Sequence, residues 1–196
     1  MGRTSDAKER ILDSAQSLIY ARSYADVGVQ EICEKAGVKK GSFYHFFPSK
    51  SDLTLAVLEQ YWAQFQTHIL NPAFNNDIPP LKRFARFQNL VFEFHKQSKV
   101  DTGKLCGCPY GNLASELSTQ DDHIRLKVKH IFSEIILYFK NNLKQASEAG
   151  ECDCVDIDTT SRALFAYIEG IVILAKTEND PNVLKELSPH FYNLIH

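Results

Sequence analysis

Residues 37–50 read GVKKGSFYHFFPSK, a stretch that predicts a short helix between two helix-ending residues. Gly37 is the residue type that most often ends a helix in the left-handed conformation. Pro48 stops the next helix, because proline lacks the backbone N–H that a continuing helix needs. Between them, Phe43 and Phe47 are four residues apart, so both side chains can pack inward from one helix face. The expected arrangement is a helix-turn-helix unit.

The outward side of the short helix is polar and basic. When such a helix enters the major groove of DNA, lysines supply charge to phosphates, and hydroxyl and imidazole groups bond to phosphates or base edges. Ser49 opens the next helix, and Asp52, three residues later, completes a capping-box pattern. Lys50, in the first turn of that helix, lies among free backbone N–H groups that also attract phosphate. We therefore expect DNA contacts, with a merely solvated face as the alternative, from Lys39, Lys40, Ser42, Tyr44, His45 and Lys50.

Residues from about 8 to 55, centred on AGVKKGSFYHFFPSK, look like the DNA-binding domain of TetR-family transcriptional regulators. The positions in register are Ala36-Gly37-Val38, Gly41-Ser42-Phe43-Tyr44, Phe47 and Ser49-Lys50. The resemblance implies that Gln30, near the start of the preceding helix, contacts a base. It assigns contacts with base edges or phosphate to Ser42, Tyr44, His45 and Lys50.

Two positions near this unit are not settled by the pattern. Gly28 stands at the helix N-cap where the family usually has Thr or Ser, which removes a side-chain cap and a possible phosphate contact. As a cap, glycine costs only roughly a few tenths of a kcal/mol. Phe46 can either project toward DNA or pack under the N-terminal arm.

Charge is unevenly distributed along the 196 residues. A net charge of −2 argues against a protein that coats nucleic acid over its whole surface. Residues 1–50 nevertheless hold eight Lys and Arg against six Asp and Glu, which gives +2 there and leaves −4 for the rest. An acidic partner is therefore expected at the N-terminal quarter.

The sequence has no apolar run of signal-peptide or membrane-spanning length. Its five cysteines are an odd number without the pattern of a disulfide framework, which favours a reducing compartment. We expect a cytoplasmic protein with no membrane partner.

Helical periodicity extends along nearly the whole chain, and no convincing strand is present. Loops are expected at 71–80 and 98–108, and Pro109 is suited to start a short helix. The predicted fold is all-α with about nine helices. We divide it into a helix-turn-helix DNA-binding domain at 1–50 and a ligand-binding and dimerisation domain at 51–196.

Dimerisation is expected because helix-turn-helix units usually read paired half-sites. The predicted helix 159–176 is apolar nearly all round, and Ala163, Ala166 and Gly170 permit close helix approach. With the last helix it could form a four-helix interface in a homodimer. Packing within one chain is the alternative. The last helix contributes Leu184, Leu187, Phe191 and Leu194.

An effector pocket is expected among the middle helices, for an apolar, aromatic or electrophilic small molecule. Each candidate lining residue could equally be ordinary core. The aromatic candidates are Trp62, Phe65, Phe87, Phe94, Tyr110, Phe132 and Tyr167.

Cys108 directly precedes Pro109, and a helix N-terminus lowers the pKa of a thiol and favours the reactive thiolate. The Gly-Cys pair followed by Gly-Asn-Leu-Ala-x-Glu is similar to a TetR subgroup, some of whose members sense electrophiles or oxidants through this cysteine. That resemblance implies a partner role for Lys176, and Cys106 could take part. The alternative is a small buried residue at a helix start. Cys33 falls on an apolar stripe and is expected in the core.

Two C-x-C pairs, at 106–108 and 152–154, could together form a tetrathiolate metal site, although their spacing is shorter than in usual zinc sites. A metal-sensing regulator is therefore one alternative, and an all-α enzyme or small-molecule carrier is another. We find no paired acid/base motif, phosphate loop or nucleophile elbow. The leading interpretation is a dimeric regulator, not an enzyme and with no cofactor or metal. We expect it to be a repressor that leaves a double-stranded DNA operator upon small-molecule binding or thiol modification, with activation of transcription as the alternative.

Overall fold

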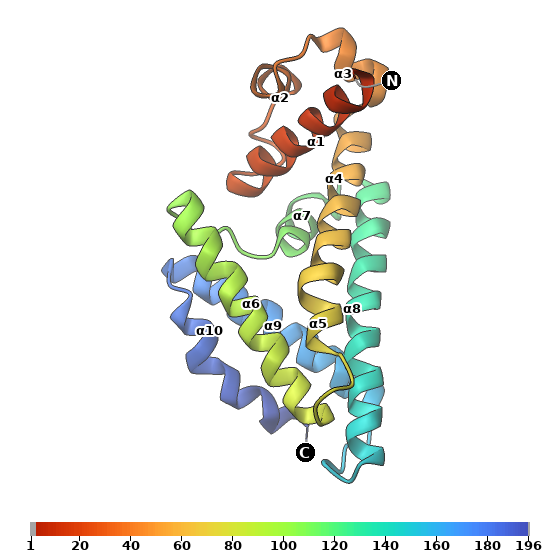
Figure 1. Cartoon of the computed structure of the whole chain (residues 1–196), viewed down its shortest axis with the longest axis vertical. Coiled ribbons are helices and arrows are strands. Elements are labelled where there is room, and N and C mark those ends of the chain that lie inside the picture. The colour runs from red at the N-terminus through yellow and green to blue at the C-terminus, as the bar shows by residue number, and fades with distance from the viewer. Residues whose placement is uncertain (1–2, 196) are drawn as a thin grey trace. The chain divides into compact units, whose positions relative to one another are not determined.

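The computed structural model describes residues 3–195 and shows them as helices joined by turns (Figure 1). A π-helical turn, η1, continues α4 into α5, and a 3-10 helix, η2, continues α10, so residues 3–195 hold nine continuous helical stretches. The predicted all-α fold with about nine helices is confirmed. The elements are α1 (Arg3–Ala21), α2 (Val29–Ala36), α3 (Lys40–Phe46), α4 (Lys50–Phe65), η1 (Gln66–Leu70), α5 (Asn71–Ala73), α6 (Pro80–Thr102), α7 (Pro109–Leu117), α8 (Asp122–Glu148), α9 (Ile157–Glu178), α10 (Asn182–Leu187) and η2 (Ser188–Leu194).

Two predicted loops begin later than expected. The helix carrying α4 passes Asn71, because the Asn71 N–H donates to the carbonyl of Gln66, five residues back, in the wider π turn. Helix α6 runs to Thr102 and ends at Gly103, whose φ of 76° is left-handed. Both helices therefore do end in these regions, but three to five residues later than expected.

The chain divides into two compact units. Unit 1 comprises the residues up to Trp62 together with Pro109–Lys129, and unit 2 comprises Ala63–Cys108 and the residues from His130 onward. The predicted boundary at residue 50 separates the helix-turn-helix DNA-binding domain from the rest of the chain. The two units are instead defined by which residues lie close together. Functional division at residue 50 stays a prediction. None of the helices in residues 3–195 is both long and apolar enough to cross a membrane.

Unit 2 is built around a cluster of phenylalanine rings. Phe84 and Phe139 are fully buried and meet edge to face, with ring centroids 5.4 Å apart. Phe87 lies 5.1 Å from Phe139, and Phe191 of η2 lies 5.2 Å from Phe84. Phe74, just after α5, adds a fifth ring at 5.7 Å from Phe87. Aromatic pairs in this range stabilise by more than their buried area alone.

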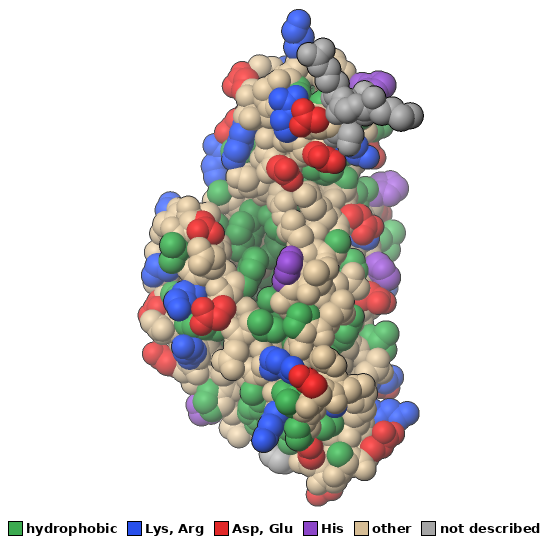
Figure 2. Space-filling model, viewed as in Figure 1, with side chains coloured by type: hydrophobic (Ala, Val, Ile, Leu, Met, Phe, Trp, Pro, Cys, Tyr) green, Lys and Arg blue, Asp and Glu red, His purple; other side chains and the backbone are tan. Residues whose placement is uncertain are grey.

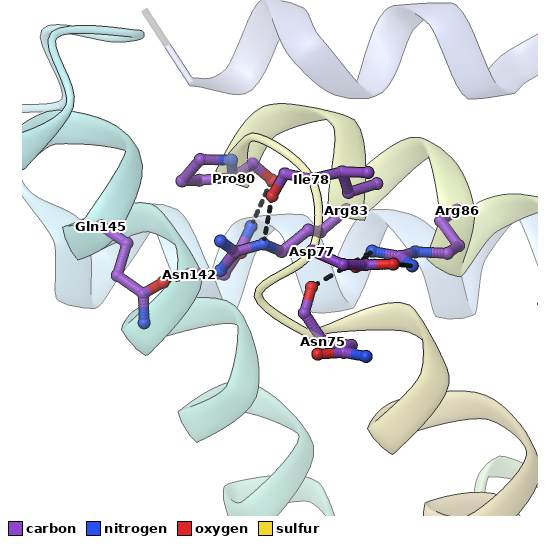
Figure 3. Close-up of polar contacts among 8 residues, drawn as sticks. All are labelled: Asn75, Asp77, Ile78, Pro80, Arg83, Arg86, Asn142 and Gln145. Atoms are coloured by element: carbon purple, nitrogen blue, oxygen red, sulfur yellow. Dashed lines mark hydrogen bonds and ion pairs between the residues drawn. The ribbon is translucent and has the colours of Figure 1, made fainter.

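Arg83 fixes the start of α6 against α8 in the same unit (Figure 3). This guanidinium is buried, and its partners are neutral oxygen atoms: the carbonyl of Ile78 at 2.9 Å and the side-chain oxygen of Gln145 at 2.6 Å. The amide of Asn142 in turn donates to the carbonyl of Pro80 at 2.9 Å. Hydrogen bonds of this kind offset part of the cost of burying a charge.

Arg86, one turn later on α6, holds the preceding loop (Figure 3). It makes two bonds to the carboxylate of Asp77, at 2.6 and 3.0 Å, and a third to the carbonyl of Asn75 at 3.1 Å. The hydrogen bond from Arg86 is the main reason that the pKa of Asp77 is lowered. Together, Arg83 and Arg86 position the loop between α5 and α6.

Candidate DNA-binding surface

Gly37 ends α2 as predicted. Its φ of 64° and ψ of 38° are left-handed, and its N–H donates to the carbonyl of Glu34 at 3.1 Å. The next N–H, of Val38, reaches the carbonyl of Cys33 at 2.9 Å, which completes the usual glycine-ended helix terminus. Cys33 is 2% exposed and belongs to the core, as expected, and burial raises the pKa of its thiol.

Helix α3 is anchored by the two predicted phenylalanines. Phe43 and Phe47 are both buried, and their ring centroids lie 6.0 Å apart. Tyr44 lies on the other side and is 54% exposed, with its ring 5.1 Å from that of Phe43. Phe46, whose orientation the sequence left open, is half-buried and packs against the ring of His45 at 4.9 Å.

Most of the predicted DNA-contacting residues lie together on and beside α3. Lys39, Lys40, Tyr44 and His45 are exposed, and Ser42 is half-buried. Gln30 is exposed on α2, where its amide donates to the carboxylate of Glu34 at 2.6 Å. On the face that Figure 2 shows, basic side chains over α1–α3 lie among acidic ones. This mixture agrees with the small positive excess of the N-terminal quarter.

Lys50 is placed differently from the other predicted contacts. Its ammonium donates to the carbonyl of Tyr24 and lies 3.8 Å from the centre of the Tyr24 ring. Partial burial lowers the pKa of Lys50, and the charge of Glu116 opposes this change. The Lys50 ammonium is thus bonded within the chain, and its contact with phosphate stays a prediction.

The start of α4 carries the predicted capping pair. Ser49 accepts a hydrogen bond from the N–H of Asp52 at 3.1 Å, and its hydroxyl donates to the Asp52 carboxylate at 2.7 Å. The predicted cap is confirmed. At α2, Gly28 has extended backbone angles and makes no side-chain cap bond.

Sequence reasoning missed the contacts that α7 and the residue just before α8 make with this region. The carboxylate of Glu116 accepts hydrogen bonds from the N–H groups of Tyr24 and Ala25, at 3.0 and 2.7 Å. The Ser51 hydroxyl donates to Asp121 at 2.6 Å, and this bond is the largest cause of the lowered pKa of Asp121. Glu116 ends the Gly-Asn-Leu-Ala-x-Glu run, but nothing in that run indicates a partner 91 or 92 residues away.

The predicted effector-site aromatics belong to both units. Trp62 and Tyr110 are in unit 1, whereas Phe65, Phe87, Phe94, Phe132 and Tyr167 are in unit 2. In unit 2, Phe87 belongs to the phenylalanine cluster and lies 6.5 Å from Phe65. The ring of Phe132 packs on Phe165 at 4.9 Å, and the Tyr167 hydroxyl donates to the carbonyl of Leu187 at 2.8 Å. Phe94 is 40% exposed. Their role in ligand binding stays a prediction.

An open groove of about 390 Å³ lies in unit 2 between α6 and the segment formed by α10 and η2. Its walls include Gln88, Phe92 and Tyr192, and the ammonium of Lys185 lies 4.0 Å from the centre of the Phe92 ring. None of the predicted effector-site residues lines it. Figure 2 shows side chains of both charges over α6 and α10.

All five cysteines carry thiols and form no disulfide. Cys106 is buried, and Cys108 is half-buried directly before α7. The carboxyl of Glu169 on α9 is hydrogen-bonded to Cys108, which opposes a larger effect of burial that raises the pKa of Glu169. Cys152 is buried, which raises the pKa of its thiol. Lys176, the predicted partner of Cys108, is exposed near the end of α9.

Residues 3–195 contain no group of three or more His, Cys, Asp or Glu side chains arranged to hold a metal ion. The two C-x-C pairs, at 106–108 and 152–154, therefore do not come together as a tetrathiolate site in the described part of the chain.

Comparison with known proteins identifies the class that this fold and surface define. Residues 11–57 match the bacterial regulatory proteins of the tetR family, and residues 80–191 match the tetracyclin repressor-like C-terminal domain. The second match alone covers more than half of the chain. The chain belongs to the TetR family, and it is a DNA-binding transcriptional regulator rather than an enzyme.

Relatives that match over most of their length support this assignment. An uncharacterized HTH-type transcriptional regulator in the lacX 3′ region of Lactococcus lactis is 31% identical over 180 residues, covering 92% of this chain and 88% of its own. Transcriptional regulator AcuR of Cereibacter sphaeroides is 31% identical over 199 residues, covering 97% and 88%. A crystal structure of regulatory protein TetR from Rhodobacter sphaeroides has a TM-score of 0.86 at 28% identity, covering 97% and 99%.

Proposed function

We propose that this regulator is a homodimeric repressor, released from its operator when a small molecule binds or when Cys108 is modified. The observation that carries the DNA-binding part is the division of α3 into two faces. Phe43 and Phe47 are buried while Lys39, Lys40 and Tyr44 are exposed. A short helix held in this way presents its polar side to a groove. The names of two relatives, the repressors DhaR of Mycobacterium and NemR of Escherichia coli, agree with repression.

DNA contact at this surface is tested by salt-dependent binding to the promoter region of the protein's own gene. Lys40→Ala should weaken binding to all sequences and reduce the slope of log affinity against log salt by about one, because one phosphate contact is lost. Lys144→Ala, an exposed lysine in unit 2, is the control and should leave the slope unchanged. Gln30→Ala should instead change the preferred bases. Operator binding that does not depend on salt concentration would overturn the DNA-binding part of the proposal.

The homodimer is proposed to form through the exposed face of α9. Ala166, Gly170 and Ile173 lie on one side of this helix, and Ile173 is 59% exposed. Leu174 is also exposed, at 47%. Of the four residues predicted from the last helix, Leu184 and Phe191 are buried within the protomer. Only Leu187 and Leu194 are accessible to a second copy. An apolar strip with small residues at its centre suits close packing against a second copy.

Ile173→Glu tests this interface, because a charge within it would be buried without a partner. We expect a monomer by light scattering, together with loss of tight operator binding. Val100→Glu is the control, since Val100 is an exposed apolar residue in the same unit but not on α9. A variant Ile173→Glu that remains dimeric would rule out this face.

Release through Cys108 is supported by its place in the chain. This cysteine is only half-buried, and the next residue is the first of α7. The carboxyl of Glu169 is hydrogen-bonded to it and can serve as acceptor for the thiol proton. An adduct releases DNA only if it favours the DNA-incompetent state, and a coupling of roughly 1–3 kcal/mol corresponds to about 5- to 150-fold weaker binding.

N-ethylmaleimide is a suitable probe, because the cysteine sulfur adds to its C=C bond and the thiol proton ends on the neighbouring carbon. The treated wild-type protein should lose at least about fivefold in operator affinity. Cys108→Ser should keep its affinity after treatment, whereas Cys106→Ser should still respond. If Cys108→Ser is released as readily as the wild type, Cys108 is not the switch.

A further inference from the structure

Glu116 on α7 is bonded to the turn that precedes α2. Its two carboxylate oxygens accept from the N–H groups of Tyr24, at 3.0 Å, and Ala25, at 2.7 Å. Hydrogen bonds to an ionised acceptor are stronger than neutral ones, and two on one carboxylate also fix its orientation. We propose that Glu116 is a positioning residue for DNA binding, whose carboxylate holds α2 and α3 in the arrangement that fits the operator.

The turn in question is held from a second side by Lys50. The N–H of Tyr24 goes to Glu116, while its carbonyl accepts from the Lys50 ammonium, which also lies over the Tyr24 ring. Tyr24 therefore has both backbone polar groups bonded to charged side chains. Arg22 and Glu31 add an ion pair of 2.5 Å that spans the same turn. A turn bonded in this way sets where α2 begins.

Helices α2 and α3, called the reader below, are bonded to the same part of the chain at their other end as well. Helices α2 and α3 occupy Val29–Phe46, and the first turn of α4 follows after three residues. In that turn, the Ser51 hydroxyl donates to Asp121, which lies between α7 and α8. The residues before and after the reader are thus bonded to Glu116 and Asp121, which are only five positions apart. Because both ends are held by one segment, its position determines the orientation of α2 and α3 relative to that segment.

The variant Glu116→Gln tests the role of the carboxylate with little change of shape. A neutral amide offers one acceptor oxygen, so one of the two N–H groups loses its strong partner. We expect operator affinity to fall by about tenfold at constant salt, since a lost bond to a charged group has an effect of this order. The slope of log affinity against log salt should not change, because no phosphate contact is removed.

Simple electrostatics predicts the opposite sign. Removing a negative charge from the DNA-binding unit should strengthen attraction to phosphate. Asp122→Asn, which removes one charge from an exposed residue of the same unit, is the matched control and should bind as tightly as the wild type or more tightly. Affinity of Glu116→Gln that equals or exceeds that of the wild type would overturn the proposal.

Hydrogen exchange separates positioning from general unfolding. In Glu116→Gln the amides of Tyr24 and Ala25 should exchange faster than in the wild type, while the buried α1 residue Ala15 keeps its protection. Unchanged exchange at residues 24 and 25 would also overturn the proposal. Should Glu116→Gln fail to fold, Ser51→Ala removes the bond at the other end, and we expect about threefold weaker operator binding. Unchanged affinity there would again count against it.

The positioning role of Glu116 rests on the proposed DNA binding by the α3 surface, but the two can fail separately. Wild-type protein that does not bind its operator would contradict DNA binding by the α3 surface. Wild-type protein that binds, and whose Lys40→Ala variant binds more weakly, would leave that function intact even if Glu116→Gln had no effect.

Discussion

Two regions of this regulator, the phenylalanine cluster of unit 2 and the turn before α2 in unit 1, are held by different kinds of interaction. Unit 2 encloses five phenylalanine rings, among them Phe84 and Phe139, in contacts that involve no charge. In unit 1 the turn before the DNA reader is fixed by charged and hydrogen-bonding groups, with Glu116 and Lys50 at its centre. Dispersion contacts sum over many atoms and change gradually, whereas a few directional bonds hold one orientation and are lost completely when they break. The orientation of the DNA-binding helices thus depends on directional bonds, which are more easily switched than dispersion contacts.

The largest effect is expected from opening the phenylalanine cluster. Phe84→Ala removes a ring that is fully buried among three others, and we expect the free energy of unfolding to fall by about 3–5 kcal/mol. Urea unfolding measures this. Phe94→Ala, on the same helix but 40% exposed, is the control and should cost less than about 1 kcal/mol. Equal losses in the two variants would show that the cluster does not dominate unit 2.

A buried histidine gives the same unit a dependence on pH. His95 is 3% exposed, its Nδ1 has no hydrogen-bond partner, and burial lowers its pKa to about 4. The unfolded chain binds a proton below pH 6.5, whereas the folded protein does so only near pH 4. Stability from this residue is therefore complete above pH 6.5 and is lost as the pH falls toward 4, by about 3 kcal/mol in total.

His95→Leu should remove this contribution, so that its unfolding free energy declines less steeply between pH 6.5 and 4 than that of the wild type. Parallel pH profiles for the two proteins would contradict the assignment. Proton NMR of the wild-type imidazole offers a second measurement, because the His95 ring should stay neutral down to about pH 4.

The separation in sequence between interacting residues explains what could be predicted from the sequence. Gly37, Phe43 and the Ser49–Asp52 cap act between near neighbours in the chain, and their roles were predicted correctly. The π turn that carries α4 past Asn71 has no local residue signature, so that boundary was missed. Contacts across long sequence separations, such as Glu116 with Ala25, depend on how helices pack, which periodicity does not reveal.

Lys50 illustrates the same limit within the candidate site. Its position at a helix start predicted a phosphate contact, because the sequence indicates which residues are basic and near the reader. Only the structure indicates that the ammonium is directed to Tyr24. The residues on the outward face of α3 were predictable, because one helix and two buried anchors suffice to define that face.

A moderate effect is expected at the turn between α2 and α3. In Gly37→Ala the new methyl group has room, with Arg10 as its nearest neighbour at 3.6 Å, but the φ of 64° is unfavourable for alanine. We expect a loss of about 1 kcal/mol in stability, seen as a shift in the unfolding of unit 1. Gly41→Ala is the matched control, because nothing lies within 4 Å of the new carbon and the site is helical, so stability should rise. A gain in both variants would mean that the turn tolerates a different conformation.

The smallest effect is expected at Gly28, where the test is whether a missing capping side chain weakens operator binding. The backbone angles, φ −86° and ψ 152°, suit any cap residue, and no atom lies within 4 Å of an added Cβ. Gly28→Ser supplies a hydroxyl that can accept from the first N–H groups of α2, which should stabilise the fold by only a few tenths of a kcal/mol, roughly. If operator affinity rises together with the salt slope, the hydroxyl has gained a phosphate contact as well as a cap. If affinity stays constant while stability rises, Gly28 affects only the fold, and the orientation of the reader depends on Glu116 and Lys50 instead.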